Sequence, residues 1–208
     1  MLNNISIKFK YFLPISLPIL LIFFRGIADF TVLLIGLVFL YQSYKSNSWQ
    51  WVKQQWFIFS LIFWLYLLLI NTPLSINSSE SALYSLAFIR WPLFAMAISI
   101  WVLNNHVSQK YFLISLAATF LFITLDVWWQ FFFDYDFFGN PRYSFTPERL
   151  TGPFRNNPMP GIFMARYLFL LLYLGYFIKY IQAPVKNTSF IFLILLLGTL
   201  SIYITGER

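Results

Sequence analysis

Long apolar segments alternate with short polar ones along almost the whole chain. The apolar segments predict helices at 10–24, 28–44, 55–70, 80–103, 109–132, 158–181 and 188–205. Most are near the length of about 17 to 25 residues that crosses a bilayer as a helix. The first two are short and meet at "FFRGIADF", where we expect Gly26 to permit a tight reversal. One long kinked helix is an alternative for this pair. The pattern predicts an all-α polytopic transmembrane bundle of about seven spans.

The longest polar connection, 133–157, is expected to be an outward-facing loop. Its bends are predicted at Gly139-Asn140-Pro141, Gly152-Pro153 and Asn157-Pro158. Pro160 and Gly161 then fall in the first turn of the helix at 158–181, and backbone N–H groups at a helix start attract anions. We see no internal repeat or low-complexity tract, so the sequence predicts a single transmembrane domain over 1–208.

Composition supports this fold class and excludes several others. Of the 208 residues, 60% are hydrophobic and only 10% are charged, whereas a soluble domain carries about a quarter charged residues. The first apolar segment lacks a small-residue cleavage site and is expected to be a retained helix. The absence of cysteine excludes disulfides and thiolate metal sites. In a soluble chain the net charge of +7 would suggest binding to nucleic acid. In a membrane protein the basic residues are first considered as indicators of which loops lie in the cytoplasm.

The lysines predict the orientation of the spans. With the N-terminus in the cytoplasm, every lysine falls on the cytoplasmic side, as the positive-inside rule requires. These residues are Lys8, Lys10, Lys45, Lys53, Lys110, Lys179 and Lys186.

The arginines follow the opposite distribution. Most lie in or beside the outward connections: Arg25, Arg142, Arg149, Arg155 and Arg208. Arg90 and Arg166 fall inside predicted helices, roughly 12 to 15 Å from the outer end at 1.5 Å per residue. The acidic residues are also placed toward the outside: Asp29, Glu80, Asp126, Asp134, Asp136, Glu148 and Glu207. Because lysine accounts for the topology, arginine needs another explanation.

Arginines within spans usually face the bundle interior or an aqueous cavity. Arginine binds carboxylate or phosphate oxygens in pairs and stays charged. Arg25, Arg90 and Arg166 would therefore suit a cationic chamber for an anionic lipid headgroup such as a pyrophosphate. The alternative is that simple pairs between helices, with Asp126 or Glu80 at similar depth, satisfy these charges.

Other candidate groups give weaker indications. Asp134 and Asp136 could bind a divalent cation, although solvated loop acids are the favoured interpretation. His106 falls in a cytoplasmic connection, and no catalytic role is expected for it. Trp101, Trp128 and Trp129 are assigned to interfacial belts, with sugar stacking left open for the last two. The sequence contains no Ser-His-Asp set, phosphate-binding glycine loop or zinc-ligand spacing.

The order of the polar motifs resembles the O-antigen ligase and Wzy-type polymerase family. The chain carries "DVWWQ", then "FFG", then "RLTGPFRNNPMPGIFMAR", and finally a helix that ends in "YITGER". In that family a helix ending in Asp-x-x-x-Gln leads into a loop with Arg-Leu-Thr/Ser-Gly-x-Phe, and a later helix closes in a Gly-Glu-Arg type motif. The matching residues are Asp126, Gln130, Arg149 to Phe154 with Gly152, Gly161, and Gly206-Glu207-Arg208. "FIRWPLF" around Arg90 is also similar to the family's arginine-bearing helix.

The resemblance implies a metal-independent, cofactor-free inverting glycosyltransferase in the bacterial inner membrane. Its donor would be an undecaprenyl-diphosphate-linked glycan, and its acceptor lipid A core or a second glycan repeat on the periplasmic face. The residues expected to contact diphosphate are Arg208, Arg166, Arg149, Arg90 and Arg25. Those expected to support the loop or helices are Asp126, Gln130, Gly152, Gly161 and Glu207. Members have more spans and a large loop that supplies the catalytic base, so the chain is expected to be the N-terminal part of a longer protein, without that base.

Two alternatives from other classes remain open. A transporter or flippase for an anionic lipid or organic anion would use the same arginines, but it should show paired helix interruptions and a path to both faces. A structural subunit would have all its arginines paired.

Overall fold

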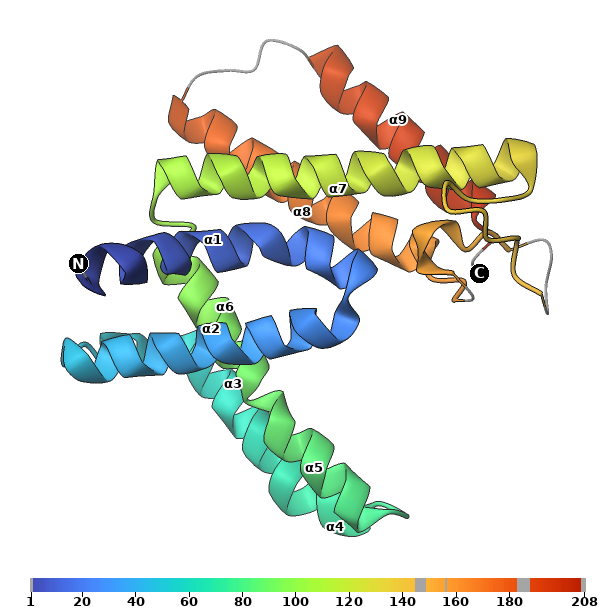
Figure 1. The fold of residues 1–208 in the computed structure, drawn as a ribbon. Coiled ribbons are helices and arrows are strands. Elements are labelled where there is room, and N and C mark those ends of the chain that lie inside the picture. Colours follow the sequence, from blue (N-terminus) through green and yellow to red (C-terminus); the bar gives the residue numbers. More distant parts are fainter. Residues whose placement is uncertain (1, 145–148, 156, 183–187, 207–208) are drawn as a thin grey trace. The chain divides into compact units, whose positions relative to one another are not determined.

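The computed structural model describes residues 2–144, 149–155, 157–182 and 188–206, and the side chains of 12–144, 149–155, 157–173 and 195–206 (Figure 1). The described residues are all-α and form no β-strand, although a lone antiparallel bridge joins Tyr135 and Pro141. This confirms the predicted fold class. The chain forms two compact units. Unit 1 consists of Met1–Pro14 and Gly26–Asn105, and unit 2 of Ile15–Arg25 and His106–Arg208. That 1–208 is a single domain stays a prediction.

The helices lie where the hydrophobic pattern predicts them. They are α1 (Leu2–Phe23), α2 (Arg25–Lys45), α3 (Gln55–Tyr66), α4 (Thr72–Leu74), α5 (Ser78–Phe88), α6 (Arg90–Trp101), α7 (His106–Phe133), α8 (Pro160–Gln182) and α9 (Thr188–Ile204), with short turns η1 (Gln50–Lys53), η2 (Leu67–Asn71) and η3 (Gly152–Phe154). Four continuous or nearly continuous segments are long and apolar enough to cross a membrane: Arg25–Lys45, Gln55–Leu74, Ser78–Trp101 and His106–Phe133. Shorter apolar helices in the described chain are Phe12–Phe23, Pro160–Tyr173 and Leu195–Ile204.

Two details differ from expectation. The segment predicted as a single helix at 80–103 is broken at Ile89, between α5 and α6. Pro92 has no N–H to donate to the carbonyl of Phe88, so the regular series of backbone hydrogen bonds in the helix is interrupted there. Gly26 lies inside the first turn of α2, away from positive φ and with nothing within 4 Å of a hypothetical Cβ. The chain therefore does not need glycine at the junction of α1 and α2, where Phe24 alone lies outside both helices.

Unit 1 has an aromatic core. Its buried members are Ile35, Phe39, Trp51, Phe57, Met96, Ala97 and Trp101. The Trp51 ring contacts Phe39 and Phe57 with centroid distances of 5.0 and 4.9 Å. The assignment of Trp101 to an interfacial belt is wrong, because its side chain packs against Phe39 inside this core and is only 3% exposed.

Unit 2 is held together by close helix packing and a few polar contacts. Helix α7 packs against both α8 and α9. Gly198 of α9 permits this approach, since a Cβ there would lie 3.1 Å from Leu168 and 3.2 Å from Phe120. Hydrogen bonds to backbone carbonyls help to join the segment 15–25 to the unit. Ser115 donates to the carbonyl of Ile15 at 2.6 Å, and Tyr167 donates to that of Pro18 at 3.1 Å.

We predict that Gly198→Val destabilises the protein by about 1–3 kcal/mol, because a branched side chain overpacks the α7–α8–α9 contact. Thr199→Val is the matched control, since Thr199 is exposed and hydrogen-bonds only its own helix in the described chain. Thermal unfolding in phosphatidylcholine nanodiscs measures the difference. Equal melting temperatures for the two variants would contradict the packing role of Gly198.

Candidate functional site

Gln130 joins the end of α7 to the loop that follows it. Its side chain is fully buried. Its Oε1 accepts the backbone N–H groups of Thr151 at 2.8 Å and Gly152 at 2.9 Å. Its Nε2 donates to the Thr151 hydroxyl at 3.0 Å and to the carbonyl of Pro141 at 3.3 Å. One amide therefore fixes two separated parts of the loop onto the helix.

Gly152 occupies a position that excludes a side chain. Its φ of +49° lies in the left-handed region. A Cβ would also lie 3.0 Å from the side chain of Val127, closer than nine in ten real Cβ contacts. Glycine is needed here both for its backbone conformation and for the close approach to α7.

Asp126 lies one turn before Gln130 on the same face of α7 and is also fully buried. Its Oδ1 accepts the N–H of Phe137 at 2.7 Å, which brings the start of the loop back onto the helix. Its Oδ2 has no hydrogen-bond partner among the described residues. The pairing of Asp126 with an arginine, left open as an alternative, is not found in the part of the chain that the structure describes.

The two loop aspartates are occupied by contacts within the loop. Both oxygens of Asp136 accept hydrogen bonds, from the N–H of Phe138 and from the N–H and side chain of Asn140 at 2.7–2.9 Å. Asp136 is therefore a buried turn residue, and the interpretation of both acids as solvated is wrong for this one. Asp134 forms an ion pair with Arg142 at 2.9 Å, and that guanidinium also donates to the carbonyl of Phe131.

Arg25 lies beside the start of α8. Its Nη2 is 3.5 Å from the sulfur of Met159, and its guanidinium carbon is 5.7 Å from the centre of the Phe154 ring. Phe154 ends η3, while Met159 immediately precedes α8. These contacts bring Arg25 next to the loop segment that Gln130 holds.

The loop carries two further arginines on either side of that segment. Arg149 is half-buried and precedes Leu150, whose N–H donates to the carbonyl of Thr205 at 3.3 Å. Arg155 is exposed and follows Phe154 with φ +58°, a conformation that non-glycine residues rarely adopt. Such backbone strain persists only where the surroundings impose it, and it is often found at functional sites. The sequence analysis did not include Arg155 in the candidate site.

Arg166 and Gly161 lie on different faces of α8. Gly161 is buried in the first turn. Arg166, more than a turn further on, is exposed in the same register as Ile162, Phe169 and Tyr173. Glu207 and Arg208 lie outside the described residues.

Arg90 belongs to unit 1 and has an acidic partner there. Its Nη2 is 3.4 Å from Asp29 Oδ1, and its guanidinium carbon is 5.3 Å from the centre of the Trp91 ring. The partner is Asp29 of α2, and not Asp126 or Glu80, the acids named in the alternative of simple pairs between helices. This ion pair gives Arg90 a structural explanation that Arg25, Arg149 and Arg166 lack among the described residues.

The end of α9 supplies polar contacts that the sequence analysis missed. Ser201 and Thr205, both buried, are one turn apart. The Ser201 hydroxyl accepts the indole N–H of Trp128 at 2.9 Å, and the backbone carbonyl of Thr205 accepts the Leu150 N–H at 3.3 Å. The hydroxyl of Ser201 in a mostly apolar helix is the signal that could have identified the first contact, whereas the second uses a backbone carbonyl that no side-chain pattern marks. Trp129, the other half of the tryptophan pair, packs against Phe133 with ring centres 4.2 Å apart.

No protein-family model, curated protein or solved structure matches the chain in comparisons with known proteins.

The site in unit 2 combines positive charge with a fixed backbone. The loop folds back beside the ends of α7 and α9 (Figure 1). Arg149 and Arg155 border the held segment 150–154 along the chain, and Arg25 contacts Phe154 and Met159 next to the positive end of the α8 dipole. The only ion pairs between described residues use Arg90 and Arg142. This arrangement can bind an anion with several oxygens.

We predict that Gln130→Leu detaches the loop, because it leaves the buried N–H groups of Thr151 and Gly152 without an acceptor. Each orphaned donor costs about 1–3 kcal/mol. Limited proteolysis between 142 and 158 should then become faster, whereas Phe132→Leu, on the exposed face of the same helix, should leave it unchanged. An unaltered cleavage rate in Gln130→Leu would contradict the role of this amide.

Proposed function

We propose that the chain is the donor-binding membrane portion of a glycosyltransferase of the O-antigen ligase or polymerase type. It holds the diphosphate of an undecaprenyl-linked glycan at the periplasmic face of a bacterial inner membrane, with its N-terminus in the cytoplasm. The acceptor is lipid A core or a second glycan repeat.

The division of the arginines into paired and unpaired residues carries this proposal. Arg90 and Arg142 have acidic partners. The other described arginines, Arg25, Arg149, Arg155 and Arg166, have no acidic partner among the described residues. The structural alternative requires all arginines to be paired. It accounts for Arg90 and Arg142, whereas this second group forms no such pair within the described part of the chain.

The position of Arg25 is also unfavourable for the fold itself. It is the first residue of α2, and a cation at a helix N-terminus opposes the helix dipole. A nearby anion would reverse the sign of this interaction. A diphosphate offers several oxygens, and guanidinium groups bind such oxygens in pairs through charge-assisted hydrogen bonds.

The proposed reaction explains why fixed guanidinium groups would increase the rate of glycan transfer. The acceptor hydroxyl oxygen attacks the anomeric carbon, the bond from that carbon to the diphosphate oxygen breaks, and the hydroxyl proton passes to a base. Negative charge grows on the departing diphosphate, and fixed guanidinium groups stabilise it. Held by Gln130, the loop keeps Arg149 and Arg155 in place without reorganisation during the reaction.

We predict that Arg25→Gln and Arg149→Gln each weaken binding of undecaprenyl diphosphate by about ten- to hundredfold, the loss expected for hydrogen bonds to charged groups. Microscale thermophoresis of the chain in phosphatidylcholine nanodiscs measures the affinity, with undecaprenol as the probe that lacks phosphate. Lys45→Gln and Lys53→Gln are the matched controls. Each removes one positive charge, Lys45 at the opposite end of α2 and Lys53 at the end of the turn η1.

Two outcomes would overturn the proposal. Equal affinity for undecaprenol and its diphosphate would mean that the arginines do not recognise phosphate. Movement of undecaprenyl diphosphate between the leaflets of proteoliposomes, abolished by Arg25→Gln, would assign the chain to the alternative class of lipid transporters.

A further inference from the structure

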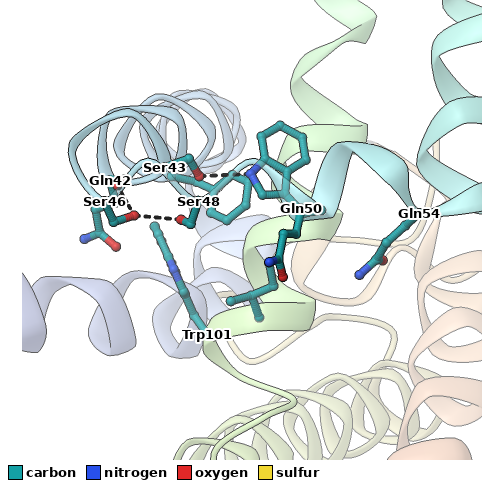
Figure 2. Close-up of a pocket in the computed structure, with 10 residues that line it drawn as sticks. Gln42, Ser43, Ser46, Ser48, Gln50, Gln54 and Trp101 are labelled. Carbon is teal, nitrogen blue, oxygen red and sulfur yellow. Dashed lines mark hydrogen bonds between the residues drawn. The ribbon is translucent and has the colours of Figure 1, made fainter.

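Unit 1 contains a pocket at the end of α2 opposite to Arg25. Its volume is about 530 Å³, within the range of about 300–1,000 Å³ typical of small-molecule sites. Six of its lining residues are polar and uncharged: Gln42, Ser43, Ser46, Ser48, Gln50 and Gln54. Figure 2 shows the serines on the side of α2 and the amides of Gln50 and Gln54 on the side of the following turn. Phe39, Trp51, Ile100 and Trp101 supply the apolar part of the lining.

The sequence builds this polar wall through the way α2 ends. Asn47 adopts φ +49°, the left-handed conformation that terminates many helices. The N–H of Ser48 donates to the carbonyl of Ser43, and that of Asn47 donates to Tyr44. This capping motif turns the chain sharply, so that residues 46–54 fold back over the last turn of α2. The buried indole of Trp51 fixes the return by donating to the Ser43 hydroxyl at 3.1 Å.

The wall offers both donors and acceptors of hydrogen bonds. The Ser46 hydroxyl donates to the carbonyl of Gln42 at 2.8 Å, so its 2.6 Å contact with Ser48 uses the Ser48 proton and leaves acceptor capacity on Ser48. Gln54 uses its Oε1 to accept from Trp56, which leaves its NH₂ group as a donor. The amide of Gln50 has no hydrogen-bond partner among the described residues.

We propose that this pocket binds an uncharged polyhydroxyl group, a hexosyl headgroup carried by a glycolipid. Sugar hydroxyls donate and accept at the same time, which matches a wall of amides and hydroxyls. No charged side chain lines the pocket, so an anion or a cation would lose its hydration without a compensating charge.

Aromatic residues around the same segments favour a lipid as the source of the headgroup. Tyr41, Tyr44, Trp49 and Trp56 are exposed, and exposed tyrosine and tryptophan are typical of the membrane–water interface. Lys45 and Lys53 flank the turn, which puts it on the predicted cytoplasmic side. Along α2 the pocket lies about 30 Å from Arg25, at 1.5 Å per residue. It is therefore a site distinct from the one proposed for the diphosphate, and the two can be tested separately.

The test compares monoglucosyl diacylglycerol with diacylglycerol in phosphatidylcholine nanodiscs that contain the full chain. Native mass spectrometry counts the lipid retained by the protein. We expect retention of the glucosyl lipid only, with apparent affinity reduced about tenfold by Gln50→Leu, the loss of one or two neutral hydrogen bonds. Ser48→Leu, which fills the pocket from an exposed position, should act in the same way. Gln55→Leu is the matched control, because Gln55 is exposed and does not line the pocket.

Three results would overturn the proposal. One is retention of diacylglycerol to the same extent as the glucosyl lipid. Another is unchanged affinity of Gln50→Leu and Ser48→Leu for the glucosyl lipid. Free methyl glucoside that binds with the same dependence on Gln50, without retention of the lipid, would assign the pocket to a soluble sugar. Melting temperatures of both variants equal to that of Gln55→Leu show that any loss of binding is not a loss of folding.

Discussion

The hydrogen bonds of one buried amide determine the geometry of the end of unit 2. Gln130 satisfies two adjacent backbone N–H groups of the loop and at the same time contacts Pro141, eleven residues away along the chain. A buried donor without an acceptor is costly, so the loop has one arrangement in which these groups are satisfied. Arg149 and Arg155 lie on either side of the segment held in this way. Their position is therefore a consequence of an amide on α7 rather than of any contact between the arginines themselves.

Close packing around glycine complements this polar contact. Helices in lipid gain little from burying apolar surface against each other, because the surrounding tails are equally apolar. Small residues and hydrogen bonds between helices then decide which faces meet. Gly152 lets the loop approach Val127, and Gly198 lets α9 approach Leu168 and Phe120. The Trp128–Ser201 bond fixes the register of α7 and α9 at the same end. The apolar majority of the chain makes the spans, but a few small and polar residues select their neighbours.

Local features of the sequence were enough for the helices and for part of the site. Hydropathy predicts each helix because the number of residues that crosses a bilayer is fixed, and the break at Ile89 could have been anticipated from Pro92. Asp126, Gln130 and Gly152 were identified through a resemblance, and the structure brings them together. The partner of Arg90 could not be predicted, because depth in the membrane does not specify which helices are adjacent. Asp29 comes from α2, whereas Asp126 has the loop as its partner. The burial of Asp136 and Trp101 was missed for the same reason, since both depend on contacts formed by folding rather than on local pattern.

Helix α2 links two chemically different environments. At its first residue a guanidinium with no acidic partner in the described chain lies beside an aromatic ring and the start of another helix. Beside its last turn lies a pocket lined by serine hydroxyls, glutamine amides and apolar side chains, with no charged side chain in the lining. A transport path would need to favour one solute from entry to exit, yet a group suited to the first environment loses its hydration without compensation in the second. The two ends of α2 therefore differ in charge and in hydrogen-bonding groups, and a solute that suits one of these environments is poorly solvated in the other.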